Sequence, residues 1–449
     1  MNGLSHLESL PEELTKQICW EVIGHLGDHL GDLDQIRGEI QYDTPSLASL
    51  CRTSRRLRNI TTPVLYSRFT TLRGAEKAVQ FLVTISQRPN LGAYVKKLDL
   101  CQGTSMDEII MRRLFKTTRV DGKMTEAQRI IINRAAASLG IDAASLRLEE
   151  FATIVQLILA YTPFVTHLHI ATLLAGTVHY GWGYTILKQL AAQDPRMVSL
   201  PHLRNLHLEH VKDMNFGSSF SLQYFAGIFE LAPFITTLHM DPCSGINLSE
   251  QFARPRISLG NVTTLSLTQG DTPNNAVKWI VGDCVQLKHF RYHGLEYPAM
   301  DRVTPREIIE ILRLHKDNLL SISLLLKAKT KSDFDLSISM PLFADDVLSI
   351  LFPRADAPDY HTHVLKVMLP QSIKNFRFTT PQKECIANLD TVADYRAEFF
   401  PHLQSIYLTN SSKVFPEQEK AFDPNEIEAL RKKLKNAKVQ FKHVELAYP

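Results

Sequence analysis

The stretch Leu203-Arg-Asn-Leu206-His-Leu208 is one of a series of six-residue motifs that decide the fold of this chain. Each motif has apolar residues at its first, fourth and sixth positions, and its second half alternates with the period of a half-buried strand. We identify such motifs at Val95–Leu100, Val165–Ile170, Leu203–Leu208, Ile235–Met240, Val262–Leu267, Leu287–Tyr292, Leu319–Leu324, Ile373–Phe378, Leu403–Leu408 and Phe441–Leu446. The series predicts strands over most of the chain.

Amphipathic segments with helical spacing lie between several of the motifs, at 149–161, 222–231, 306–315 and 425–434. Alternation of strand and helix predicts an α/β fold with parallel strands. One strand and its helix cannot bury their apolar faces alone, so successive pairs must stack on one another. The longest intervals between motifs indicate insertions or undetected strands, and one insertion, at about 101–147, contains two predicted helices.

This succession of motifs resembles a degenerate leucine-rich repeat array that covers residues 69–449. The resemblance implies an irregular solenoid with parallel strands inside an arc and helices outside it. It also implies that a target protein binds to the exposed face of the strands.

Side chains that flank the central apolar residue of each motif point away from the core. His169, His207 and His239 share one column, which predicts a ladder with a spacing of about 5 Å. Such a ladder could hydrogen-bond a partner or hold a metal; strands of one sheet seldom aim three ligands at a tetrahedral centre, so no metal site is predicted. The candidate target-binding residues are His167, His169, His207, His239, His289, Arg291, Arg377 and Tyr407.

The N-terminal segment contains two predicted helices. Leu10, Leu14 and Ile18 recur at a spacing of four residues, with Pro11 in the first turn. A second helix is predicted from about Ser46 to Arg58, and it should stop before Pro63. A loop rich in Gly and Asp, residues 27–45, separates the two helices.

The two helices, together with Pro63-Val-Leu-Tyr66, resemble an F-box over residues 1–68, although the loop at 27–45 is longer than is typical of that family. The resemblance implies docking to the Skp-type adaptor of a cullin–RING ubiquitin ligase. Helix-in-groove recognition needs apolar anchors on one face, and by resemblance the anchors are Leu10, Pro11, Leu14, Ile18, Leu47, Leu50 and Leu57. Alternatively, some of these residues pack against the repeats.

Composition excludes several classes of function. The formal charge is +3, from 50 basic and 47 acidic residues, which provides no field for nucleic acid or a membrane surface. The six cysteines form no Cys-x-x-Cys pair, and the N-terminus lacks the pattern of a signal peptide, so a cytoplasmic or nuclear location is expected. Phosphate-binding loops, nucleophile turns and zinc-protease motifs are not found, and neither an enzyme nor a cofactor is predicted.

The resulting hypothesis is a substrate-recognition subunit of a Skp–cullin–F-box ubiquitin ligase, which binds the adaptor and a target protein of unknown identity. Two alternatives stay open. One is a scaffold that uses the adaptor alone, without ubiquitination. The other is a hydrolase built on the repeat domain, which would require clustered titratable residues with perturbed pKa values in a deep pocket.

Overall fold

The computed structural model describes residues 9–23, 44–71, 75–101, 124–142, 146, 151–172, 186–187, 189–190, 200–210, 225–241, 259–270, 274–294, 305–315, 318–325, 375–379, 384–399, 401–410 and 423–445. The chain forms two compact units, unit 1 with Met1–Ala171 and Tyr184–Leu203, and unit 2 with Thr172–Gly183 and Arg204–Pro449. None of the helices in the described ranges is both long and apolar enough to cross a bilayer.

Unit 1 combines helices with a parallel sheet of order β1-β2-β3. Its strands are β1 (Arg68–Thr70), β2 (Lys97–Cys101) and β3 (His167–Thr172). Its helices are α2 (Glu12–Ile23), α4 (Thr44–Thr53), α5 (Arg55–Tyr66), α6 (Ala75–Gln87), α7 (Pro89–Gly92), α9 (Glu126–Ser138) and α10 (Phe151–Tyr161). Of the two helices predicted within residues 101–147, α9 is described, and the other lies outside the described residues.

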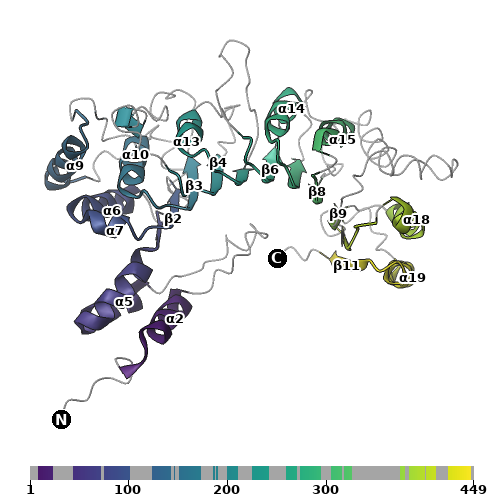
Figure 1. Ribbon diagram of the computed structural model, residues 1–449, viewed down its shortest axis with the longest axis horizontal. Coiled ribbons are helices and arrows are strands. Elements are labelled where there is room, and N and C mark those ends of the chain that lie inside the picture. The colour runs from purple at the N-terminus through teal and green to yellow at the C-terminus, as the bar shows by residue number, and fades with distance from the viewer. Residues whose placement is uncertain are drawn as a thin grey trace, which may run out of the picture. The chain divides into compact units, whose positions relative to one another are not determined.

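Unit 2 has strands in the order of the chain, and every pair of neighbours is parallel. The strands are β4 (Asn205–His210), β5 (Thr237–Asp241), β6 (Thr264–Gly270), β7 (His289–Gly294), β8 (Ser321–Leu325), β9 (Asn375–Thr379), β10 (Ser405–Asn410) and β11 (Gln440–Glu445). The helices are α13 (Ala226–Leu231), α14 (Asn274–Asp283), α15 (Pro305–Leu312) with the 3-10 turn η3 (Arg313–His315), α18 (Glu384–Phe399) and α19 (Pro424–Asn436). In Figure 1, α14 and α15 lie on the same side of strands β6 and β8. The predicted α/β class with parallel strands is confirmed.

The central apolar residues of the motifs lie in register across neighbouring strands. In unit 1 the column is Phe69, Leu98 and Leu168. In unit 2 the column is Leu206, Leu238, Leu265, Phe290, Ile322, Phe376, Ile406 and Phe441. Leu98 and Leu168 in unit 1 and Leu206, Leu238, Leu265, Phe290 and Ile406 in unit 2 are almost fully buried, with Leu98 at 2% and Leu206 at 0% exposure, whereas Phe69 is half-buried. The motif register predicted from the sequence is therefore correct for every motif except the last.

The last motif was placed three residues too late. The structure pairs Ile406 with Phe441 and Leu408 with His443, so Phe441 holds the central position that the sequence analysis gave to Val444. Each register contains two apolar residues that lie two positions apart. They are Val444 and Leu446 in the predicted register, and Val439 and Phe441, both buried, in the observed one. His443 consequently lies in a core-side column, and Lys442 takes the outward position beside Tyr407.

A shared backbone acceptor marks the start of several strands. The carbonyl of Ser67 accepts hydrogen bonds from the amides of Lys96 and Lys97, at 2.8 and 3.0 Å. The carbonyl of Lys96 in turn accepts from Thr166 and His167, at the same two distances. Three carbonyls of unit 2, those of Arg204, Thr236 and Thr263, repeat the arrangement with the next strand along the chain. Strands β2, β3, β5, β6 and β7 are thus each aligned to the preceding strand by a backbone contact that does not depend on their side chains.

The predicted second helix of the N-terminal segment is in fact two helices. Ser54 breaks the run, and its hydroxyl accepts the Leu57 amide as the N-cap of α5, at 3.2 Å. The helix then continues through Pro63 to Tyr66, contrary to the expectation that it would stop. Pro63 falls in the last turn, and burial of Ile60 and Val64 on the same helix compensates for its missing amide donor.

Helix α10 is buried on all sides from Phe151 to Leu159, so it is a core helix rather than an amphipathic one. Its polar residue Gln156, 2% exposed, accepts the backbone amide of Ile186 at 3.0 Å. The end of α10 also lies against Gly92, because a Cβ at Gly92 would be 1.9 Å from the Tyr161 carbonyl oxygen. Only glycine allows this approach.

A buried histidine makes the stability of unit 2 depend on pH. His315 is 5% exposed, and its Nε2–H donates to the Val281 carbonyl at 2.8 Å, which ties η3 to α14. Burial lowers the pKa of His315 below its ordinary value of 6.5, although the Val281 carbonyl opposes this shift. The folded state therefore favours the neutral ring. This stabilisation is complete above the unfolded pKa and is lost as pH falls through the folded pKa.

We therefore expect the unfolding temperature to fall between about pH 7.5 and about pH 5, and to fall less for His315→Gln, which keeps a donor but does not titrate. Thermal unfolding followed by circular dichroism across this range measures the difference. Parallel curves for the wild type and the variant would contradict the role of His315.

Candidate functional site

Helix α2 carries apolar side chains on its exposed side. Leu14 is 47% and Ile18 37% exposed, and the two lie one helical turn apart on the same face. The opposite side of the helix packs inward, where Cys19 is fully buried in a cluster with Leu47 and Val64. The guanidinium of Arg56 donates to the Leu10 carbonyl at 2.7 Å, which fixes the start of α2 against α5. The exposed stripe is thus presented on a supported helix.

The other predicted adaptor contacts divide between surface and core. Pro11 is exposed, and Leu10 and Leu50 are half-buried. Leu47 and Leu57, at 0% and 2% exposure, are core residues of the helical segment. Their side chains are therefore not presented on the surface, and their predicted contact with an adaptor stays a prediction. Helical spacing places residues on one face of a helix, but it does not tell an outward face from an inward one.

The outward sheet face of unit 1 contains a hydrogen-bonded chain across its three strands. The Asp99 carboxylate on β2 accepts from His169 Nδ1 on β3, at 2.7 Å, and from the Thr70 hydroxyl on β1, at 3.3 Å. A carboxylate can only accept, so Nδ1 of His169 carries the proton of this hydrogen bond. Asp99 is only 8% exposed. Contrary to the expectation of a solvated face, Asp99 is nearly covered, while Thr70 and His169 are half-buried.

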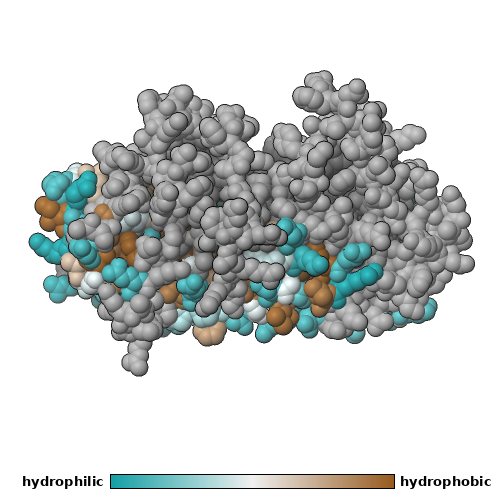
Figure 2. All heavy atoms as spheres, turned by 90° about the horizontal axis from the view of Figure 1, so that it is seen from above, coloured by the Kyte–Doolittle hydropathy of each residue, from teal (hydrophilic) through white to brown (hydrophobic). Residues whose placement is uncertain are grey.

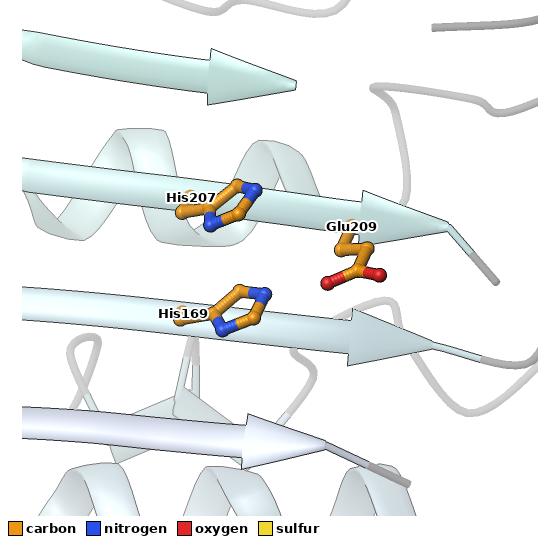
Figure 3. Close-up of side chains that lie close together, drawn as sticks. All are labelled: His169, His207 and Glu209. Carbon is orange, nitrogen blue, oxygen red and sulfur yellow. The ribbon is translucent and has the colours of Figure 1, made fainter. Parts of the chain in front are cut away.

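On unit 2, His207 of β4 and His239 of β5 lie in register, with ring centroids 5.9 Å apart in an edge-on arrangement. The predicted spacing holds for this pair, while His169, the third member of the proposed ladder, belongs to unit 1. Figure 3 shows His207 and Glu209 on β4, and His169 on β3. His239 is 8% and its neighbour Ser266 1% exposed, so these positions are also less exposed than predicted.

The remaining predicted target-binding residues lie on outward positions of their strands. His167 on β3, and His289 and Arg291 on β7, are half-buried. Burial lowers the pKa of His289, with a smaller contribution from the charge of Lys288. Arg377 on β9 lies in register with Tyr407 on β10, and their side chains are outside the described set.

Sequence reasoning missed Arg68, which opens β1 and pairs with Lys97. The strand has only three residues, and Thr71 stands where the other motifs have an apolar residue, so the motif pattern could not reveal it. The alignment of Arg68 beside Lys97 gives unit 1 a basic row that the predicted set of residues did not include.

The surface of the described residues mixes polar and apolar side chains, and on the face seen in Figure 2 teal and brown residues are interspersed. The exposed apolar residues include Leu14 and Trp20 on α2, Phe164 before β3 and Phe234 before β5. No protein-family model matches the chain, and no curated protein matches it in sequence. The class of protein that the geometry defines is therefore an α/β protein of sequential parallel strands, with an N-terminal helical segment that exposes an apolar stripe.

The hydrogen bonds of Asp99 predict its contribution to stability. Asp99→Asn keeps the shape of the side chain but removes the charged acceptor, and we expect a loss of about 1–3 kcal/mol in the free energy of unfolding. Glu13→Gln makes the same charge change at an exposed position of unit 1 and should have little effect. Denaturant unfolding of both variants provides the comparison, and equal stabilities would refute a structural role for the Asp99 carboxylate.

Proposed function

We propose that this chain is the substrate-recognition subunit of a Skp–cullin–F-box ubiquitin ligase. In this proposal residues 1–68 form an F-box that docks the adaptor, and the strand–helix succession is a degenerate leucine-rich repeat solenoid that holds a target protein. The chain is not an enzyme, and its contribution to ubiquitin transfer is proximity, since it positions the target. It works in the cytoplasm or nucleus, where such ligases act.

The observation that carries the proposal is the exposed pair Leu14 and Ile18 on α2. Apolar side chains one turn apart on a helix are the anchors that a groove in a partner protein recognises. The same helix is held from behind by Cys19, Leu47 and Val64, so its exposed face does not depend on the partner to fold. A preformed anchor loses less conformational entropy on binding than a disordered segment does.

Trp20 offers a matched control on the same helix. It is as exposed as Leu14, at 47%, but it lies two residues beyond Ile18 and therefore faces another direction. If the exposed stripe of Leu14 and Ile18 docks the adaptor, loss of Trp20 should matter far less than loss of Leu14 and Ile18.

The test is binding of the full chain to a purified Skp-type adaptor, measured by calorimetry. Leu14→Ala with Ile18→Ala removes about 2 kcal/mol of apolar burial, so we expect roughly thirtyfold weaker binding. Trp20→Ala should stay within about threefold of the wild type. Circular dichroism verifies that the variants are folded.

Failure of the wild type to bind any Skp-type adaptor would overturn the proposal. An equal loss for Trp20→Ala and the double variant would instead remove the assigned face. Co-purification of a cullin with the adaptor complex distinguishes a ligase subunit from a scaffold that uses the adaptor alone.

A further inference from the structure

Two turns of unit 1 each present an aromatic ring just before a strand motif. The turns are Thr162-Pro-Phe-Val165 and Leu200-Pro-His-Leu203. In each turn the amide of the last residue donates to the carbonyl of the first, at 3.3 and 3.1 Å respectively. Proline at the second position presets the backbone of such a turn, so the third residue has a defined place. That residue is Phe164, which is 40% exposed, in one turn and His202, also exposed, in the other.

A lysine, a phenyl ring and an imidazole ring lie together at these turns. The Lys96 ammonium is 4.9 Å from the centroid of the Phe164 ring. The centroid of the His202 ring is 5.2 Å from that of Phe164, and the two ring planes are tilted by 42°. All three side chains are exposed and all belong to unit 1. We call these three residues the turn cluster.

The backbone holds Lys96 in a fixed position relative to Phe164. The Lys96 carbonyl accepts hydrogen bonds from the Thr166 amide at 2.8 Å, from the His167 amide at 3.0 Å and from the Thr166 hydroxyl at 3.0 Å. Thr166 is only two residues beyond Phe164, so these bonds align the lysine with the turn that carries the ring. A surface aligned in this way loses little backbone entropy when a ligand binds.

The charge and the rings together define the chemistry of a ligand. The ammonium of Lys96 has three donors, and it forms no ion pair with any residue that the structure describes. A carboxylate can therefore accept a charge-assisted hydrogen bond from it. Phe164 and His202 lie beside this charge, and an apolar side chain that packs against their rings removes apolar surface from water.

Unit 2 repeats part of this arrangement. Phe234 follows Pro233 just before a strand motif and is 49% exposed, and the central carbon of the Arg204 guanidinium is 5.3 Å from its ring centroid. The residue before the next motif is Asn261, at the position that His202 has in unit 1. Its amide donates to the Pro233 carbonyl at 2.8 Å. Phe234 is thus a ring with a cation but without the second ring.

We infer that the turn cluster of Lys96, Phe164 and His202 binds a segment of the target protein in which an apolar residue neighbours a carboxylate. In the bound state the carboxylate pairs with Lys96, and the apolar side chain packs against the two rings. The inference rests on the target-binding part of the proposed function, but it does not require the adaptor.

A peptide fits this surface better than a single-stranded nucleic acid does, although bases also stack on aromatic rings. Nucleic-acid affinity grows with the number of phosphate contacts, and the net charge of +3 supplies no broad basic field. One lysine beside two rings instead matches one carboxylate beside one apolar group.

The experiment uses the full chain without adaptor and a fluorescein-labelled peptide of sequence Gly-Ser-Glu-Leu-Glu-Ser-Gly, called the Glu-Leu peptide. One control peptide has Gln at both Glu positions, and the other has Ser in place of Leu. Fluorescence anisotropy should show binding of the Glu-Leu peptide and at least about fivefold weaker binding of each control peptide.

Two variants test the assigned residues. Lys96→Met removes the charge but keeps an apolar side chain, and Phe164→Ala removes the ring. Each should weaken binding of the Glu-Leu peptide at least about fivefold. Lys96→Met should leave the affinity for the Gln peptide within about twofold, because the contact that it removes is the one to the carboxylate.

Two matched controls make the same changes elsewhere. Lys77→Met removes an exposed lysine on α6 of the same unit, and Phe234→Ala removes the exposed ring of unit 2. Each should leave the affinity for the Glu-Leu peptide within about twofold. Circular dichroism verifies that all four variants are folded.

The inference is overturned if the Glu-Leu peptide does not bind, or if either control peptide binds as well as it does. Equal losses for Lys77→Met and Lys96→Met, or for Phe234→Ala and Phe164→Ala, would also overturn it. So would tighter binding of a single-stranded oligonucleotide than of the Glu-Leu peptide. Because no adaptor is present, these outcomes leave the adaptor experiment unaffected.

Discussion

One backbone carbonyl that accepts two successive amides is the constraint on which the strands depend. The Ser67 carbonyl aligns β2, and the Lys96 carbonyl aligns β3 in the same way. In unit 2 the carbonyls of Arg204, Thr236 and Thr263 align the strands that follow them. Because side chains alternate along a strand, a slip of one residue would turn the apolar column outward. The carbonyl contact excludes that slip, and the in-register columns of buried residues follow from it.

The same constraint explains why strands separated by very different lengths of chain still pair regularly. The motifs at Val95 and Val165 are 70 residues apart, and those at Ile235 and Val262 only 27. Closing a longer connection costs only about 0.6 kcal/mol per doubling of its length. Burying one leucine of the column contributes about 1.5–3 kcal/mol, which exceeds that cost. Strand pairing therefore tolerates uneven spacing, provided that each motif keeps its apolar positions.

The sequence was sufficient to predict the strands because their pattern is local and has a period of two. It was insufficient where two registers satisfied that pattern, as at Phe441, and where the pattern was cut short, as at β1. It placed α4 and α5 in one helix, since the N-cap role of Ser54 depends on how the chain turns there. Burial was the least predictable property. Asp99, His239 and Ser266 are outward by alternation and yet almost inaccessible, because accessibility depends on what the rest of the fold places above a strand.

That difference between facing outward and being accessible decides where recognition can occur on unit 1. The row of Thr70, Asp99 and His169 uses its polar groups internally, and its carboxylate is nearly covered. Arg68, Lys97 and His167 lie two residues earlier on the same strands, and their side chains are half-buried, as those of Thr70 and His169 are. The backbone amides of Lys97 and His167 bind the shared carbonyls of Ser67 and Lys96, which fixes the start of β2 and of β3. Asp99 could contact a partner only by giving up its hydrogen bonds to Thr70 and His169, so its carboxylate acts within the sheet.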